Sequence, residues 1–555
     1  MPSPIFDLCD EYVTSYAALH PVFATMRGVP GYDGEAGDFG PEGAGARATL
    51  IRTTLRRLDV LEPVGDADRI AAAHLRERLS ADLAWYDAGE WMRDVRASFG
   101  LVQSLRDSVD MIAHRDDDGW RLVAGRLRDV PRALGTWRDA LREGLARGLV
   151  ASRRQALDAA IQADTYAGTG GRTPTHAALV ASYGDGPLRA ELEDAARLAH
   201  GAYQETARFL RDRYAPQATE RDGVGADRYR IWSRMALGAD VDPVEAYEWG
   251  WAELYRLEEQ MVAEAAAIRT GATLDEVEAL LDGSEYVDGP DAYRAWLQDQ
   301  HDRAIERLDG VHFDLDPALR RVEVVLAPDS GTAGVYYTGP TEDGTRPGRT
   351  WWSVAGRQRF TIWEELTTVF HEGVPGHHLQ VGTARLAGDS LSRFSRVTGV
   401  SGHSEGWALY AERFADELGW YTRPGQRLGM LKAQAMRAAR VIIDIGLHLD
   451  LPMPEREVPR YGSRWTFEVA ERVMRERARE AEHRVYSEVS RYCGWPAQAT
   501  AYKLGERAWL AAREAARRDL GDRFDLRRWH SEALAIGPAG LSTFADALAA
   551  RTAAW

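Results

Sequence analysis

Histidine and glutamate residues that could bind and use a metal ion gather between residues 363 and 380, where the sequence reads WEELTTVFHEGVPGHHLQ. The dipeptide His371-Glu372 is followed by His377 and His378. This pattern is typical of zinc hydrolases, in which two histidines bind the metal and the glutamate takes a proton from the attacking water. The segment therefore predicts a hydrolytic metal site.

The spacing within this segment departs from the usual HExxH motif, because Pro375 stands where the second histidine would be. At about 100° per residue, His377 on a straight helix would lie about 240° from His371. His378 would share the face of His371 but lie about 10 Å along the axis. Because Pro375 and Gly376 favour a kink or bulge, either histidine could reach the metal, and the spacing alone leaves both open.

A third protein ligand is expected, since catalytic zinc sites usually have three. The segment SGHSEGWALYAE over residues 401–412 predicts a second helix with Glu405 in its first turn and Glu412 on the same face. Both carboxylates could be surface charges. However, Trp407 and its apolar neighbours favour burial, and a buried carboxylate needs a partner. We expect a site built on His371, Glu372, His377 and Glu405.

Composition narrows the chemistry and the partners. Two cysteines among 555 residues, Cys9 and Cys493, are too few for a disulfide framework or a cysteine-based zinc site. A net charge of −16 argues against binding to nucleic acid or to an anionic membrane. No apolar run of about 18 residues and no leader peptide is evident. We therefore expect a cytoplasmic protein with no membrane partner; the oligomeric state stays open.

The elements that would position these residues are mostly helices, because alanine, leucine, arginine and glutamate dominate and apolar residues recur at spacings of three and four. We expect one mainly α domain over residues 1–555, with an N-terminal helical lobe over 1–230 and a catalytic lobe over 231–555. The clearest helices are expected at Pro131–Leu149, Glu191–Tyr214, Pro243–Ile268, Gly425–Leu449 and Thr466–Tyr492. Three β-rich runs between Val322 and Val354 predict a small sheet of two or three strands just before the metal motif.

Taken together, HEGVPGHHLQ at 371–380 and EGWALYAE at 405–412 resemble the signature of the domain-of-unknown-function 885 family. Weaker matching phrases, such as RVIIDIGLH at 440–448 and AYKLG at 501–505, extend the resemblance over nearly the whole chain. This family is similar to the helical gluzincin metallopeptidases, the group that contains carboxypeptidase Taq and angiotensin-converting enzyme. The resemblance implies a large helical fold with a deep cleft, one Zn²⁺ per chain, and hydrolysis of peptide or amide bonds.

The resemblance also implies roles for single residues. His371, His377 and Glu405 would bind the metal, and Glu372 would act as the base. His378 would then lie behind the ligands or face the substrate. The family commonly reads PGQALAYK where this chain has PAQATAYK at 496–503, so a glycine of that loop is replaced.

Further polar residues are candidates for catalysis around this site. Tyr502, Tyr337 and Tyr336 could donate a hydrogen bond to the developing oxyanion, although tyrosines are more often core or rim residues. His403 could contact the tetrahedral intermediate or simply begin its helix. Glu364, seven residues before His371 on the same helix face, could accept the ring N–H of that histidine. Glu412 would lie behind the ligands or contact the substrate.

One predicted helix carries a polar stripe that could recognise the charge of a substrate. Arg437, Arg440, Asp444 and His448 fall within about 80° of one another around the helix axis. They could bind a substrate carboxylate or form a buried structural network of i,i+4 pairs. Lys503 is one of only two lysines among 69 basic residues, and a compact ammonium suits a carboxylate where a guanidinium would not fit.

Three functions fit these observations. The leading hypothesis is a zinc-dependent metallopeptidase that cleaves short peptides. The first alternative is a zinc amidohydrolase that acts on a small, peptide-like metabolite. The second is a non-catalytic binding protein that retains the histidine motif, although the intact Glu372 counts against it because a structural zinc site needs no base.

Overall fold

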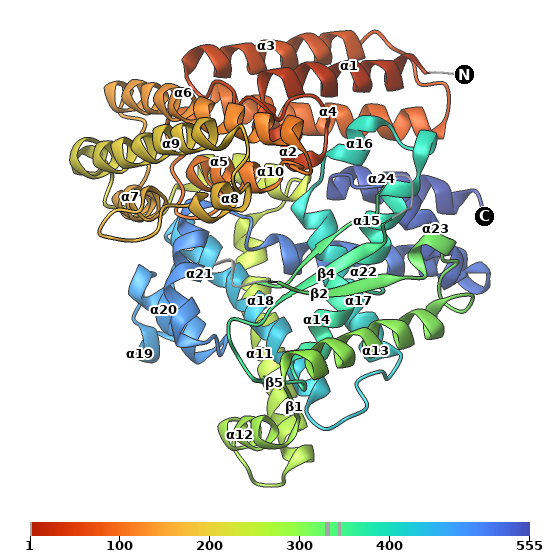
Figure 1. Cartoon of the computed structure of the whole chain (residues 1–555). Helices are drawn as coiled ribbons and strands as arrows, with labels where there is room; N and C mark the ends of the chain where they lie inside the picture. The colour runs from red at the N-terminus through yellow and green to blue at the C-terminus, as the bar shows by residue number, and fades with distance from the viewer. Residues whose placement is uncertain (1–2, 328–333, 342–345) are drawn as a thin grey trace. The chain divides into compact units, whose positions relative to one another are not determined.

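The structure is a computed structural model that describes residues 3–327, 334–341 and 346–555. Helices make up most of these residues, and the strands among them form two small sheets (Figure 1). The prediction of a mainly α fold is therefore confirmed. Across the described residues, no helix combines the length and the apolar character needed to cross a bilayer.

The chain divides into two compact units. The first comprises Met1–Trp232 together with Leu447–Asp450 and Tyr486–Pro496, and the second comprises the remainder. The division after Trp232 lies two residues from the boundary expected from the sequence. The return of two later segments to the first unit has no signal in the sequence.

The first unit is built from helices that bury an apolar face. Asp116 and Ser152 cap α6 and α7 by accepting backbone N–H groups, which satisfies donors that the first helical turn leaves free. Leu127, Trp137 and Tyr203, from α6 and α9, belong to the apolar core of this unit. Its helices are α1 (Pro4–Leu19), α2 (Pro21–Arg27), α3 (Pro41–Leu58), α4 (Asp66–Asp87), α5 (Leu101–Asp110), α6 (Asp117–Arg147), α7 (Arg153–Ala167), α8 (Ala177–Ser182), α9 (Arg189–Phe209) and most of α10 (Ala226–Leu237) and α21 (Glu482–Gly494).

The second unit carries the metal motif. Its helices are α11 (Pro243–Ile268), α12 (Leu274–Ser284), α13 (Pro290–Leu308), α14 (Glu365–Glu372), α15 (His377–Leu386), α16 (Arg393–Val397), α17 (Ser401–Glu417), most of α18 (Gln426–Leu449), α19 (Val458–Tyr461), α20 (Phe467–Glu476), α22 (Ala501–Leu520), α23 (Leu526–Ala535) and α24 (Leu541–Ala553). In α17 and α22 the backbones approach closely at glycines. A Cβ on Gly406 would lie 2.4 Å from the carbonyl carbon of Gly505, and one on Gly505 would lie 2.1 Å from the oxygen of Gly402. This close approach fixes the helix that carries Glu405.

The expected small sheet is present, with the order β2 (Val322–Ala327), β4 (Gly348–Ser353), β3 (Tyr336–Thr338). Strands β2 and β4 are parallel, with Val324 opposite Thr350, and β3 and β4 are antiparallel, with Tyr337 opposite Thr350. A second sheet of β1 (Tyr286–Asp288) and β5 (Arg359–Thr361) was not predicted. The segments that join the three β-rich runs lie in part outside the described residues.

Candidate metal centre

The histidine motif is two helices rather than one, since α14 ends at Glu372 and α15 begins at His377. The turn between them depends on glycine. A Cβ on Gly376 would lie 2.0 Å from the carbonyl oxygen of His371, and one on Gly373 would lie 2.1 Å from the ring of His301. The indole N–H of Trp407 donates to the carbonyl oxygens of Pro375 and Gly376, at 2.9 and 3.0 Å. Helix α17, which also carries Glu405, therefore stabilises the turn through Trp407.

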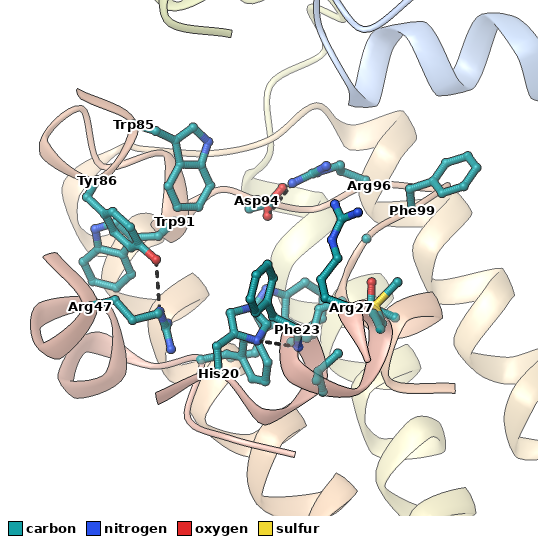
Figure 2. Close-up of a pocket in the computed structure, with 17 residues that line it drawn as sticks. His20, Phe23, Arg27, Arg47, Trp85, Tyr86, Trp91, Asp94, Arg96 and Phe99 are labelled. Atoms are coloured by element: carbon teal, nitrogen blue, oxygen red, sulfur yellow. Dashed lines mark hydrogen bonds and ion pairs between the residues drawn. The ribbon is translucent and has the colours of Figure 1, made fainter. Parts of the chain in front are cut away.

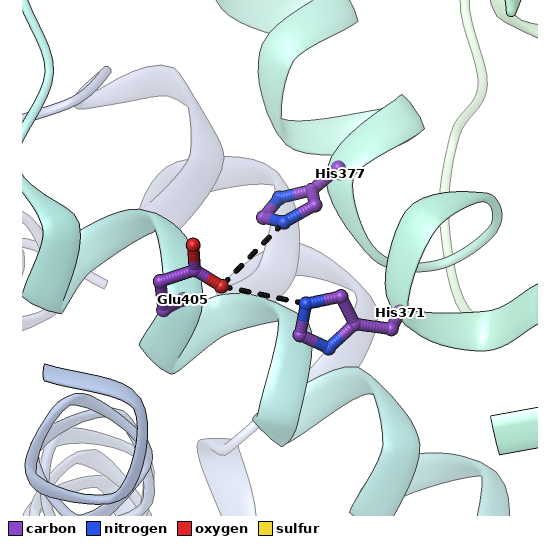
Figure 3. A group of neighbouring side chains, drawn as sticks. All are labelled: His371, His377 and Glu405. Atoms are coloured by element: carbon purple, nitrogen blue, oxygen red, sulfur yellow. Dashed lines mark ion pairs between the residues drawn. The ribbon is translucent and has the colours of Figure 1, made fainter. Parts of the chain in front are cut away.

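This turn brings His377, not His378, beside His371 (Figure 3). One Glu405 oxygen lies 3.4 Å from His371 Nε2 and 3.7 Å from His377 Nε2. One ligand atom from each of the three residues lies within 4.8 Å of the others. Donors that hold one ion tetrahedrally at about 2.1 Å are about 3.4 Å apart, so the cluster fits a single metal ion. Two imidazoles and a carboxylate are donors that Zn²⁺ accepts, as do related divalent metals.

His378 takes part in a structural contact instead. Its Nε2 donates to the carbonyl oxygen of Leu319 at 2.9 Å, which leaves Nδ1 to accept from the hydroxyl of Tyr337 at 3.0 Å. Burial lowers the pKa of His378 to about 4, so the ring is neutral. The break between α14 and α15 therefore places His377, rather than His378, at the candidate metal site. The predicted role of His378 in facing the substrate is wrong.

The same contact bears on two of the candidate oxyanion donors. The Tyr337 hydroxyl is bonded to His378, which favours a structural role, and its predicted contact with an oxyanion stays a prediction. Tyr336 is exposed and stacks on Trp351, with ring centres 5.8 Å apart. Tyr502 lies with its ring centre 4.9 Å from the guanidinium carbon of Arg440, and its catalytic role stays a prediction.

The carboxylate behind His371 is Glu412. Its Oε1 accepts from His371 Nδ1 at 2.7 Å, which leaves Nε2 as the metal-facing nitrogen. Thr367 and Gln434 donate to the other oxygen, at 2.9 and 3.2 Å, and Arg437 forms an ion pair at 3.1 Å. Although burial raises the pKa of Glu412, the charge of Arg437 and the hydrogen bond from His371 lower it below its usual value. The carboxylate is therefore ionised and orients the ring.

Glu364 does not have the predicted role behind His371. It precedes α14, and its carboxylate accepts from Lys432 Nζ at 3.0 Å. The seven-residue spacing put Glu364 on the correct helix face but two turns away, and Glu412 from α17 fills the position instead. Thr367, one turn before His371, was missed, although its i,i+4 spacing was a usable signal.

Glu372 is buried and adjoins His371, and within the described part of the chain its carboxylate has no hydrogen bond or ion pair. Burial and the nearby charge of Glu405 raise its pKa to about 7 in the metal-free protein, against the lowering effect of His371. A buried carboxylate without a fixed partner is able to accept and release a proton.

The polar stripe on α18 is divided among separate contacts. Arg437 pairs with Glu412, and Asp444 accepts the backbone N–H of Ala497 at 3.0 Å. His448 Nε2 donates to the carbonyl oxygen of Tyr492, at 3.0 Å, while its Nδ1 accepts from the N–H of Val224. Both ring nitrogens are thus occupied within the first unit, so a role for His448 in binding substrate is wrong. These contacts favour a buried structural role for the stripe over binding of a substrate carboxylate.

Lys503 is also committed inside the protein. The side chain is fully buried, and Nζ donates to Glu253 at 2.9 Å, to Gln434 at 2.8 Å and to Glu506. An ammonium has three N–H donors, and all three are used. Lys503 instead belongs to a buried cluster of ion pairs. Its predicted contact with a substrate carboxylate is therefore wrong.

His403 lies in an aromatic core. Its ring centre is 5.1 Å from that of Trp509 and 5.2 Å from that of Phe544, and Gln380 Nε2 donates to its Nδ1 at 2.8 Å. Two residues along a helix are about 200° apart, so a side chain at 403 points away from one at 405. The catalytic role considered for His403 is therefore wrong. The side chain of His403 packs within the aromatic core beside its helix.

The fold and this cluster define a mainly helical protein with a candidate His/His/Glu metal centre. The chain belongs to the DUF885 family, described as bacterial proteins of unknown function, which matches residues 21–548. No curated protein sequence matches it.

Two solved structures share the fold. A "putative lipoprotein" from Colwellia psychrerythraea superposes with a TM-score of 0.84 at 20% identity, covering 99% of each chain. A "putative lipoprotein of unknown function" from Shewanella oneidensis gives a TM-score of 0.76 at 18% identity, covering 98% of this chain and 99% of that one. At these identities the likeness extends to the fold alone.

Proposed function

We propose that the protein is a zinc-dependent hydrolase that cleaves peptide bonds in short peptides. The observation that carries this proposal is the cluster of buried His371 with partly buried His377 and Glu405, beside Glu372, a carboxylate with no partner among the described residues. A purely structural metal site would need no such carboxylate. The similarity of the family signature to gluzincin metallopeptidases supports the same chemistry.

In the proposed reaction His371, His377 and Glu405 would hold the metal. When bound, zinc would lower the pKa of water and polarise the scissile carbonyl. Glu372 would accept the proton of the attacking water and deliver it to the leaving amine. No described residue forms a hydrogen bond or ion pair with the Glu372 carboxylate, which leaves it available for proton transfer and supports this role.

The residues around the proposed metal ligands would hold those ligands in position. Glu412 fixes the ring of His371 through Nδ1, and Arg437 keeps Glu412 ionised. An outer carboxylate of this kind holds the ligand tautomer and raises the basicity of the ligand. Tyr502 remains a candidate donor to the oxyanion.

Digestion of a peptide library, read by mass spectrometry, tests the proposal. The zinc-loaded protein should cut peptides, and the cut positions would show whether it works from an end or internally. The Glu372→Gln variant, loaded with equal zinc, is the matched control and should leave the library intact. Equal cleavage by both proteins would contradict the proposed base. An intact library with hydrolysis of N-acyl amino acids instead would favour the amidohydrolase, and no hydrolysis of either class would favour a binding protein.

A further inference from the structure

A second candidate site lies in the first unit, away from the metal-binding residues in sequence. A cavity of about 410 Å³ is lined by residues from α2, α3, α4, the segment after α4, and α5 and α6 (Figure 2). Small-molecule sites have volumes of about 300–1,000 Å³. The cavity is therefore large enough for one aromatic ring with a short substituent.

Aromatic side chains form much of its wall, among them Phe23, Trp85, Tyr86 and Trp91. Phe99 also lines it and is unusual in two respects. Its φ is +56°, a backbone conformation that bulky residues rarely adopt, and the residue is 63% exposed. Local strain is more frequent at binding sites, and the ring of Phe99 extends the aromatic wall. Together they indicate a wall arranged for an aromatic or apolar group.

Some of the positive charges on the cavity wall are paired with a carboxylate and others are not. Arg96 is neutralised by Asp94, with a two-pronged contact at 2.5 and 2.9 Å. Arg47 is 4% exposed and donates to Tyr86 and to the carbonyl oxygens of Leu19 and Asp38, but no described carboxylate forms an ion pair with it. A buried arginine is rarely left without a counter-ion.

Arg27 adds a second positive charge. It lies at the end of α2, its side chain is exposed, and among the described residues it forms no hydrogen bond or ion pair. Two guanidinium groups without acidic partners therefore line one aromatic cavity, as Figure 2 shows for Arg27 and Arg47. The fork of a guanidinium matches a carboxylate or a phosphate.

We propose that this cavity binds a small aromatic anion, with its ring against the aromatic wall and its acidic group at the guanidinium of Arg27, while the charge of Arg47 adds to the positive potential of the cavity. The site does not depend on the proposed hydrolysis, because none of its residues belongs to the metal centre. Its acidic group is a carboxylate or a phosphate monoester, which share the chemistry that the guanidinium groups recognise.

Isothermal titration of the full chain with three probes tests the proposal: 3-phenylpropionate, phenyl phosphate and the neutral 3-phenylpropanamide. At least one anion should bind, and the amide should bind at least about tenfold more weakly because it lacks the charge. The tighter of the two anions identifies the acidic group. No binding of either anion at millimolar concentration, or equal binding of the amide, would overturn the proposal.

Variants locate the binding. Arg27→Gln should weaken the anion by about tenfold or more while leaving the fold intact, since Arg27 has no described partner. Arg197→Gln is the matched control, because Arg197 is an exposed arginine of α9 that pairs with Asp194, and it should change nothing. The His371→Ala/His377→Ala variant should bind as the wild type does. Loss of binding in that double variant, or unchanged binding in Arg27→Gln, would place the anion elsewhere and contradict the proposal.

Discussion

At the scale of single residues, the centre depends on which carboxylate stands behind His371. The sequence offered Glu364 for this role, and the structure gives it to Glu412, whose carboxylate contacts His371 and three further residues, Thr367, Gln434 and Arg437. A ring held through Nδ1 presents Nε2 in a fixed direction, so the metal does not have to order it.

This arrangement predicts different effects for two similar substitutions. Glu412→Gln should weaken zinc binding by about 10- to 100-fold, because the charge that orients His371 is lost. Glu364→Gln, which removes a contact with Lys432 only, should leave zinc affinity unchanged. Competition with a chromogenic chelator measures both. Equal affinities in the two variants would show that Glu412 does not support the ligand.

Replacing each of the two lysines should have a different effect on the free energy of unfolding. Lys503→Ala would remove the fully buried ammonium that binds Glu253 and Glu506, which keep contacts with Arg256 and Arg413. It should lower the free energy of unfolding by about 3 kcal/mol. Lys432→Ala breaks a partly exposed pair and should cost at most about 1 kcal/mol. Denaturant unfolding at pH 7 measures both, and a small effect of Lys503→Ala would contradict a structural role.

The pH dependence of the first effect follows from Glu253. Burial raises the pKa of Glu253, but the hydrogen bonds and charges of Arg256 and Lys503 lower this pKa to about 2, from a usual value of 4.5. Its stabilising contribution is complete above the unfolded pKa and is lost as the pH falls toward the folded pKa. The penalty of Lys503→Ala should therefore shrink as the pH falls below 4.5.

At the scale of elements, the break between α14 and α15 is the feature that builds the site. A straight helix would keep His371 and His377 on different faces, whereas the turn at Gly373–Gly376 brings them together. The turn is tight because Gly376 lies against the carbonyl groups of the preceding helix.

Gly376→Ala should therefore disrupt the metal centre. The added methyl group would overlap the carbonyl oxygen of His371, which is backbone and has little freedom to move. We expect loss of stoichiometric zinc, measured by elemental analysis, together with lower stability. Gly399→Ala is the control, since a Cβ there meets nothing within 4 Å. Full zinc in Gly376→Ala would show that the turn tolerates a side chain.

Some elements could be predicted from the sequence and others could not. The helix expected at Pro243–Ile268 has those bounds in the structure, because apolar spacing and a capping aspartate at 242 agree. The helix expected at Thr466–Tyr492 is broken between Glu476 and Glu482, where Arg479 has a φ of +54° and pairs with Asp275 and Glu278. Such tertiary ion pairs override local propensity.

Pro131 shows a different limit. It was expected to begin a helix, but it lies inside α6, which runs from Asp117 to Arg147. The clustering of His371, His377 and Glu405 could be expected from two short motifs, although spacing alone did not choose between His377 and His378. The partners of Lys503 and His448 could not be expected, because they come from segments distant in the sequence that only the fold brings near.

At the scale of the whole molecule, the chain consists of two units, and the three proposed ligands all belong to the second. A metal that binds the folded state but not the unfolded chain adds stability that grows with its concentration. The cytoplasmic location expected from the sequence stays a prediction, and cell fractionation would test it.

Metal removal should therefore lower the thermal stability. We expect a chelator to reduce the Tm of the wild-type protein, because the stabilisation of the second unit by bound metal is lost. The His371→Ala/His377→Ala variant should melt at the same temperature with and without chelator. An equal shift in both proteins would mean that the stabilising metal binds elsewhere.

The proposed function depends on Glu372 acting as a base at a metal held by His371, His377 and Glu405. The most direct measurement is the rate of peptide cleavage by wild-type and Glu372→Gln proteins that carry the same amount of zinc. We predict about one zinc per chain in both and a rate at least about 100-fold lower in the variant. Equal rates, or a wild-type protein that binds no zinc, would contradict the account.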